Sequence, residues 1–238
     1  MKNLFDLIDL KNGDIVSVVG SGGKTTFMYK LSKELSNKKV IITTSTKMFI
    51  PKEDEKFNII FLNESKNINL EKGINFLIGE IVSENKFHTN VELIDENVYG
   101  FDYLLIESDG SKRKPLKGWN ETEPVISKRT NKTVGIIPID IIGKVAKEDI
   151  IHRIEKFSKI SLISEGEEIT PEAIANVISS KNGLFKNSVG EKILFLNKIE
   201  NKKQYEMACK LLKILERKNI NINKIIGGSL LNESYFLF

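Results

Sequence analysis

The chain has 238 residues, of which 40% are hydrophobic and 29% charged, a balance typical of a soluble globular protein with a substantial core. Its formal charge of +4 comes from 36 basic and 32 acidic residues, and this mild excess does not indicate a nucleic-acid-binding protein. The single cysteine, Cys209, excludes a disulfide within the chain. No apolar stretch approaches the ~20 residues that cross a bilayer. We therefore expect a cytoplasmic protein with a single domain over residues 1–238.

Short apolar runs alternate with amphipathic segments along the chain, a pattern that indicates a mostly parallel α/β sheet. The expected strands cover residues 15–19, 40–42, 57–62, 76–82, 103–106, 133–139, 192–196 and 224–228. The expected helices are a short one from Leu4 to a stop near Gly13, one over 25–36, one over 91–97, one that opens at Thr170-Pro171 and one over 203–218. We expect a central sheet of about six or seven strands, with helices on both faces.

A glycine-rich segment, Gly20-Ser21-Gly22-Gly23, joins the first expected strand to a helix that begins Lys24-Thr25-Thr26. Glycines there allow successive backbone N–H groups to point inward, and the first turn of the helix attracts an anion. Lys24 is expected to reach the β- and γ-phosphates of bound ATP or GTP, with the Thr25 hydroxyl on Mg²⁺. The segment predicts a P-loop NTPase-like three-layer sandwich.

The spacing of this loop departs from the standard pattern G-x-x-x-x-G-K-T, which requires a glycine where the chain has Val18. The shorter form resembles the loops of Mur-type ATP-dependent ligases. Three glycines in register with Lys-Thr-Thr favour nucleotide binding over a chance glycine-rich turn, but they do not say what the nucleotide does.

An acidic element is expected at residues 102–110, where an apolar strand ends in Glu107-Ser108-Asp109-Gly110. In a parallel sheet the carboxyl end of such a strand lies beside the phosphate loop. Glu107 and Asp109 are expected to hold Mg²⁺, directly or through water, and to act with Lys24 in catalysis. The alternative for Asp109 is that it begins a turn with Gly110.

A candidate base-binding motif, Asn197-Lys198-Ile199-Glu200, ends a late strand and resembles the N-K-x-D motif that reads guanine in GTPases. Glu200 is one methylene longer than the aspartate of that motif. In a chain rich in Asn and Lys the match can also arise by chance, so base recognition and the choice between ATP and GTP stay open.

Other polar groups follow the expected strands. Thr43, Thr44, Thr46 and Lys47 close the second strand at the expected ligand edge, where they bind an oxyanion or simply cap the strand. The basic run 112–114 follows the acidic element and faces either an anionic substrate or solvent. Asp140 and the pair His152-Arg153 are further polar candidates, and the two histidines have no zinc-like spacing.

Several of these stretches together resemble a known family, the YqeC-like group of accessory proteins for selenium-dependent molybdenum hydroxylases. The matching blocks are residues 19–26, 43–49, 106–112, 115–117, 123–126, 143–144 and 152–153. The resemblance covers about residues 4 to 230, and the blocks E-x-D-G-S-K and T-T-x-T-K-M-F are specific to it. It adds the following site candidates: Thr44, Thr46, Lys47, Asp109, Lys112, Glu123, His152 and Arg153.

What the resemblance implies is a nucleotide-dependent role in maturing a labile selenium-containing cofactor, with a molybdenum hydroxylase or its maturation proteins as partners. Two alternatives stay open: an ATP-dependent enzyme that activates a small molecule, and a nucleotide switch without substrate chemistry. Replacing Lys24 with alanine is expected to abolish nucleotide binding and leave the fold intact.

Overall fold

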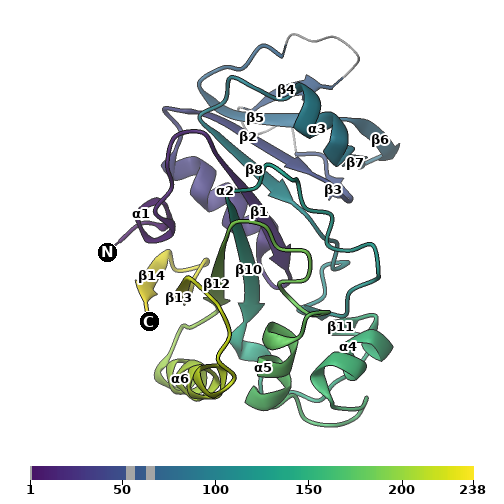
Figure 1. The fold of residues 1–238 in the computed structure, drawn as a ribbon, viewed down its shortest axis with the longest axis vertical. Coiled ribbons are helices and arrows are strands. Elements are labelled where there is room, and N and C mark those ends of the chain that lie inside the picture. The colour runs from purple at the N-terminus through teal and green to yellow at the C-terminus, as the bar shows by residue number, and fades with distance from the viewer. Residues whose placement is uncertain (1, 52–56, 63–67) are drawn as a thin grey trace.

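The protein is described by a computed structural model over residues 2–51, 57–62 and 68–238. Nine strands form one sheet: β1 (Asp14–Gly20), β2 (Lys39–Thr44), β4 (Asn58–Phe61), β5 (Gly73–Ile78), β8 (Tyr103–Glu107), β10 (Lys132–Pro138), β12 (Glu191–Asn197), β13 (Lys224–Ser229) and β14 (Ser234–Leu237). Their order is β14-β13-β12-β10-β1-β8-β2-β5-β4 (Figure 1). Among the described strands of this sheet only β14 runs antiparallel to its neighbour, so the expected mostly parallel sheet is confirmed. It has more strands than the six or seven expected.

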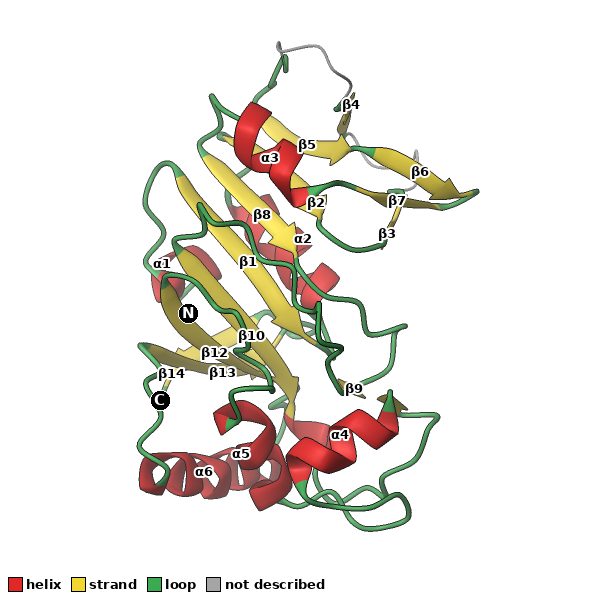
Figure 2. Ribbon diagram, turned by 45° about the vertical axis from the view of Figure 1, so that its right-hand side comes forward, coloured by secondary structure: helices red, strands yellow, loops and turns green. Residues whose placement is uncertain are grey.

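Helices cover both faces of this sheet, which gives the expected three-layer α/β arrangement. They are α1 (Leu4–Ile8), α2 (Lys24–Glu34), α3 (Val91–Asn97), α4 (Ile154–Ser161), α5 (Pro171–Ser179) and α6 (Lys202–Arg217). Helices α4, α5 and α6 gather at the end of the molecule away from β4 and β5 (Figure 2). Thr170 caps α5 as expected, since its Oγ1 accepts a hydrogen bond from Ala173 N at 3.1 Å. Helix α4 was not expected from the sequence.

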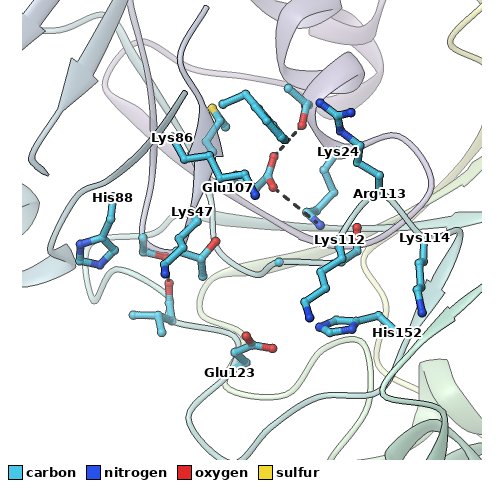
Figure 3. Close-up of a pocket in the computed structure, with 18 of the residues that line it drawn as sticks. Lys24, Lys47, Lys86, His88, Glu107, Lys112, Arg113, Lys114, Glu123 and His152 are labelled. Carbon is cyan, nitrogen blue, oxygen red and sulfur yellow. Dashed lines mark hydrogen bonds and ion pairs between the residues drawn. The ribbon is translucent and has the colours of Figure 1, made fainter. Parts of the chain in front are cut away.

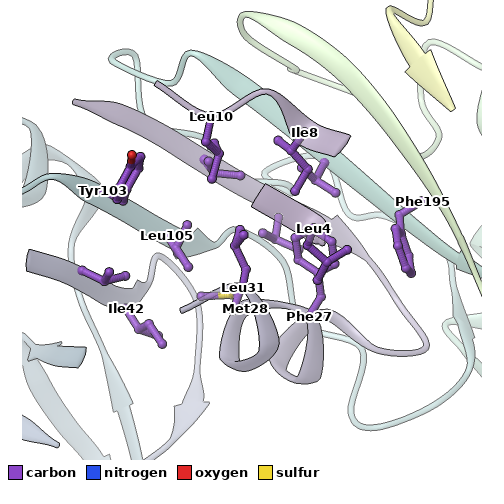
Figure 4. Close-up of a cluster of buried hydrophobic side chains, with 14 of the residues drawn as sticks. Leu4, Ile8, Leu10, Phe27, Met28, Leu31, Ile42, Tyr103, Leu105 and Phe195 are labelled. Atoms are coloured by element: carbon purple, nitrogen blue, oxygen red, sulfur yellow. The ribbon is translucent and has the colours of Figure 1, made fainter. Parts of the chain in front are cut away.

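The alternation of side chains along β1 distributes its core between the two helical layers. Val16 and Val18 pack on one face with Phe27 and other residues of α2 (Figure 4). Val19 points to the other face and belongs to the cluster that includes α5 and α6. Because β1 is buried on both faces, its residues from Ile15 to Val19 are apolar on both faces, with Ser17 as the one polar residue, rather than alternating.

Two small sheets lie outside the central one. One joins β3 (Met48–Phe49), β6 (Glu80–Ser83) and β7 (Lys86–His88), and the other joins β9 (Leu116–Lys117) to β11 (Ile151–His152). The expectation of one strand over 76–82 is wrong, because the chain passes from β5 into β6 at Gly79. A Cβ on Gly79 would lie 2.8 Å from the His88 carbonyl oxygen, so the two sheets meet closely at this residue.

The strand order places the carboxyl ends of β1 and β8 side by side. Val18 of β1 pairs with Glu107 of β8, and Gly20 pairs with Ile136 of β10 on the other side. The chain leaves β1 for β2, which lies beyond β8, and later returns to β10, so the strand order reverses around β1. Ligands of open parallel sheets bind in the crevice at such a reversal.

Candidate functional site

The loop after β1 has a backbone that only glycine adopts readily. Gly20, Gly22 and Gly23 have φ values of +93°, +76° and +142°, in the left-handed half of the map. A Cβ at Gly20 would lie 2.4 Å from the Ile136 carbonyl oxygen, so the strand beside the loop leaves no room for a side chain. Helix α2 starts at Lys24, directly after the loop, and its first N–H groups face the same crevice.

Lys24 is 4% exposed and lies among oxygen atoms. Its Nζ donates to the Gly20 carbonyl at 2.7 Å and lies 3.1 Å from Asp109 Oδ1 and 3.9 Å from Glu107 Oε1. Burial by itself lowers the pKa of the Lys24 ammonium, but the two carboxylates outweigh it and raise that pKa above its ordinary value. Lys24 therefore carries its full charge at neutral pH, as a phosphate ligand requires.

Asp109 is fully buried behind the loop. Its Oδ2 accepts hydrogen bonds from Gly20 N at 3.0 Å and from Trp119 Nε1 at 2.8 Å, and Lys117 Nζ lies 3.3 Å away. Burial opposes the charge of the carboxylate, but Lys24 and Lys117 hold the pKa of Asp109 below its ordinary value. Asp109 thus links the end of β8 to the loop backbone, and the cavity beside the loop is lined by Glu107 instead.

Glu107 and Thr25 face each other at the mouth of the loop. Thr25 Oγ1 donates to Glu107 Oε2 at 2.8 Å, and both residues line the cavity. Burial raises the pKa of Glu107, although Lys24 and the Thr25 hydroxyl act in the opposite direction. A hydroxyl and one carboxylate are the protein ligands that Mg²⁺ commonly uses beside substrate phosphates and water, so these residues fit a magnesium ion. Among the described residues no group of three or more His, Cys, Asp or Glu side chains is placed to hold a metal.

A cavity of about 870 Å³ opens beside the loop, and Figure 3 shows its charged lining. Its walls come from the loop and α2, the β2–β3 connection, β7, the turn after β8 and the start of α4. Of the candidates predicted from the sequence, this cavity brings together Gly22, Gly23, Lys24, Thr25, Thr26, Thr46, Lys47, Glu107, Lys112, Glu123, His152 and Arg153.

Several predicted candidates lie outside this lining. Thr43 and Thr44 are buried, and Thr44 Oγ1 donates to the Glu107 carbonyl at 2.9 Å, which joins the ends of β2 and β8. Ser21 Oγ donates to the Pro115 carbonyl at 2.8 Å. These hydroxyls hold neighbouring segments of the site together. Asp140 lies in a 3₁₀ turn (Ile139–Ile141) and pairs with Lys198 at 3.1 Å.

The candidate base-binding segment lies on the other side of β1, at the end of β12. Asn197 Nδ2 donates to the Gly22 carbonyl at 2.7 Å, and its Oδ1 accepts from Leu230 N at 3.2 Å. The exposed Glu200 accepts from Ser229 Oγ at 2.8 Å through Oε1. These contacts tie the loop to the ends of β12 and β13, and neither Asn197 nor Glu200 lines the cavity.

At the far wall of the cavity, Glu123 binds two cations. It accepts from Lys117 Nζ at 3.0 Å and from both guanidinium nitrogens of Arg153, the longer of these at 3.0 Å. Burial by itself would raise the pKa of Glu123, but Arg153 and Lys117 lower it. His152 is 8% exposed; burial and then the charges of Arg153, Lys117 and Lys112 lower its pKa to about 4, so it is neutral at pH 7.

Sequence reasoning missed four residues that shape this site: Phe49, Lys86, Lys117 and Trp119. Lys117 fell within a matching block, but nothing in its spacing predicted a buried partner for Asp109. Phe49 also fell within a matching block, 43–49, but it and Lys86 come from the small sheet β3–β7–β6, whose short strands give no pattern that predicts their contact. Their roles depend on contacts between segments far apart in the chain.

Comparison with known proteins places the chain in a family. A sequence model of the family described as YqeC protein matches residues 16–155, more than half of the chain. The chain belongs to the YqeC family. The match spans the phosphate loop, β8 and the Glu123–Arg153 wall, and it confirms the resemblance predicted from the sequence blocks.

One curated relative in the YqeC family covers more of the chain than the family model does. The uncharacterized protein YqeC of Escherichia coli strain K12 is 27% identical over 238 residues, with 92% of each chain covered. No solved structure matches the chain. In the described part of the chain, no helix has both the length and the apolar character needed to span a bilayer.

Proposed function

We propose that this YqeC family protein binds and hydrolyses a Mg²⁺–nucleoside triphosphate, ATP or GTP, as an accessory factor in maturing the labile selenium-containing cofactor of a molybdenum hydroxylase. The observation that carries the nucleotide part is the junction of Lys24, Thr25 and Glu107 at the open mouth of a glycine loop. The cofactor part is supported by the family resemblance alone.

The arrangement suits phosphoryl chemistry for electrostatic reasons. We expect the N–H groups of the first turn of α2, at residues 24–26, and the Lys24 ammonium to contact the phosphates, where preorganised donors offset the charge that develops in the transition state. Mg²⁺ bound by Thr25 and Glu107 would neutralise charge on the phosphate oxygens. Asp109 acts indirectly, because it holds the Lys24 ammonium and the Gly20 N–H in place from behind the loop.

Thermal unfolding with Mg-ATP and with Mg-GTP tests nucleotide binding. At 100 times its dissociation constant a ligand stabilises the folded state by about 2.7 kcal/mol, which is a readily measured shift. We expect the wild-type protein to show this shift, Lys24→Met to lose it, and Lys33→Met, an exposed lysine on the same helix, to keep it. A wild-type protein that neither nucleotide stabilises would refute the proposal.

A second variant is needed beside Lys24→Met, because Lys24 neutralises two buried carboxylates, Glu107 and Asp109. The sequence-based expectation that its removal leaves the fold intact does not suit this environment, since breaking a buried ion pair costs about 3–5 kcal/mol. Thr25→Val leaves the pairs between Lys24 and the carboxylates in place and removes only the hydroxyl. We expect it to weaken nucleotide binding in the presence of Mg²⁺ and to have a smaller effect in EDTA.

The cofactor part has its own measurement. In cells that make a selenium-dependent molybdenum hydroxylase, deleting this protein is expected to lower the selenium content of that enzyme and leave its molybdenum content unchanged. Rescue by the wild-type chain, but not by Thr25→Val, would connect the maturation to the nucleotide site. Unchanged selenium in the deletion strain would refute this part and leave nucleotide binding intact.

Two alternatives differ in the kinetics they predict. An enzyme that activates a small molecule would release phosphate or pyrophosphate in a fixed ratio to a second substrate. A nucleotide switch would hydrolyse very slowly until a partner protein is added. The extent of the cavity beyond the phosphate loop favours a second small ligand.

A further inference from the structure

The cavity is larger than a phosphate chain requires, and most of the residues that line it lie outside the 20–26 loop. Its volume of about 870 Å³ is near the upper end of the ~300–1,000 Å³ range of ligand sites. Among the described residues, seven Lys and Arg side chains and two carboxylates, Glu107 and Glu123, line it. Both carboxylates already have cationic partners, so the field in the cavity is strongly positive.

Four of these cations donate no side-chain hydrogen bond and form no ion pair within residues 2–51, 57–62 and 68–238. Lys47 and Lys112 form neither a hydrogen bond nor an ion pair with these described residues. Arg113 and Lys86 contact the ring of Phe49, at 4.1 Å and 4.7 Å from its centroid. By contrast, Lys114 donates to the carbonyls of Glu148 and Ile151, and Arg153 is paired with Glu123.

The turn that carries two of these cations is conformationally unusual. Lys112 and Arg113 have φ values of 50° and 62°, in the left-handed region that residues other than glycine seldom adopt. Arg153, across the cavity, has a φ of 58°. Strain of this kind persists only where surrounding contacts maintain it, and it clusters at ligand sites. In this protein Lys112, Arg113 and Arg153 are all basic and line the same cavity.

The free cations and the candidate base-binding residues lie on opposite sides of β1. The candidate base-binding residues Asn197 and Glu200 lie toward β12 and β13, whereas the free cations lie on the side of β8, β2 and β7. A nucleotide with its phosphates in the 20–26 loop and its base near β12 would leave the cationic part of the cavity open. Glu107, the proposed magnesium ligand, stands at the boundary between the two parts.

We propose that the part of the cavity lined by Lys47, Lys86, Lys112 and Arg113 binds a second ligand beside the nucleotide, a small molecule that carries a phosphate or carboxylate group. The position of the nucleotide rests on the proposed function, but the anion site does not. His152, which lines the cavity at the wall beside Glu123, is neutral at pH 7, so its ring can accept as well as donate a hydrogen bond. The ligand would lie next to the terminal phosphate, as a reaction partner must.

Isothermal titration of two small anions tests the site. Inorganic phosphate and citrate are titrated separately into protein saturated with Mg²⁺ and a non-hydrolysable nucleotide analogue. We expect at least one of them to bind, and the double variant Lys112→Gln/Arg113→Gln to bind it at least tenfold more weakly. The control Lys203→Gln/Lys210→Gln makes the same charge change on exposed positions of α6 and is expected to change the affinity less than twofold. Which anion binds distinguishes a phosphate from a carboxylate ligand.

Several results would overturn the proposal. Neither anion binding to the loaded protein, or equal weakening in both double variants, would mean that no built site exists. A double variant that weakens the nucleotide instead would place the base in this cavity. If the protein binds no nucleotide at all, the same titrations on the nucleotide-free wild-type protein still report on the anion site, so failure of the proposed function is distinguishable from failure of this inference.

Discussion

Replacing Asp109 with alanine is expected to lower the free energy of unfolding by about 3–5 kcal/mol, the cost of breaking a buried ion pair from one side. The carboxylate lies 3.1 Å from Lys24 Nζ and 3.3 Å from Lys117 Nζ, and none of these three side chains is more than 4% exposed. Its removal leaves the Gly20 N–H and the Trp119 indole N–H without their acceptor and takes one carboxylate away from each of two buried ammonium groups. Few single substitutions in this protein should cost more.

Denaturant unfolding at pH 7 measures this loss, with Asp149→Ala as a matched control at an exposed position. The control is expected to change stability by no more than about 0.5 kcal/mol. Asp109→Asn keeps an oxygen acceptor and removes only the charge, so its cost should lie between the two. An Asp109→Ala protein as stable as the control would contradict the buried network.

The same network sets a pH dependence. Because Lys24 and Lys117 lower the pKa of Asp109 in the folded protein, its contribution is complete above the pKa of about 3.9 of an unfolded aspartate. It is lost as the pH falls through the lower pKa of the folded state. Stability of the wild-type protein should therefore fall more steeply in this acid range than that of Asp109→Asn, which lacks the titrating group.

If the segment from Asn197 to Glu200 reads the base, the protein prefers GTP to ATP, and Glu200→Gln is expected to remove that preference. Guanine offers two N–H donors on its Watson–Crick edge, whereas adenine offers one donor and one acceptor, so only guanine satisfies a carboxylate twice. Hydrogen bonds to charged groups contribute about 1.5–3 kcal/mol each. Two of them correspond to a difference of about 100-fold or more in the dissociation constant.

The geometry around Glu200 supports this expectation. Ser229 fixes one carboxylate oxygen of Glu200, and Asn197 bonds the Gly22 carbonyl, so the candidate base-binding segment is anchored to the phosphate loop. Competition binding with Mg-GTP and Mg-ATP measures the preference, and Glu216→Gln, exposed at the end of α6, is the control. Equal affinity for the two nucleotides in the wild-type protein would mean that the base is read elsewhere.

The elements that the sequence predicted correctly are those whose backbone conformation is set by their own residues and near neighbours in the chain. The β-branched run of β1, the glycines that follow it and the capped start of α5 each specify their own backbone conformation. The prediction is wrong where strands are short or where a helix lacks a standard cap. The run over 76–82 contains two strands of different sheets, and α4 begins after a left-handed Arg153 rather than at a standard cap.

In the candidate site, too, some contacts are predictable from local motifs and others are not. That Lys24, Thr25 and Glu107 meet follows from two motifs and the rule that parallel strands end at one edge, and this much the sequence by itself determined. The role of Asp109 as a buried anchor, the bond from Asn197 to the loop and the convergence of Phe49, Lys86 and Arg113 were decided only by the tertiary structure. They depend on burial and on contacts between segments up to 175 residues apart, and no local pattern of residue types encodes either of these.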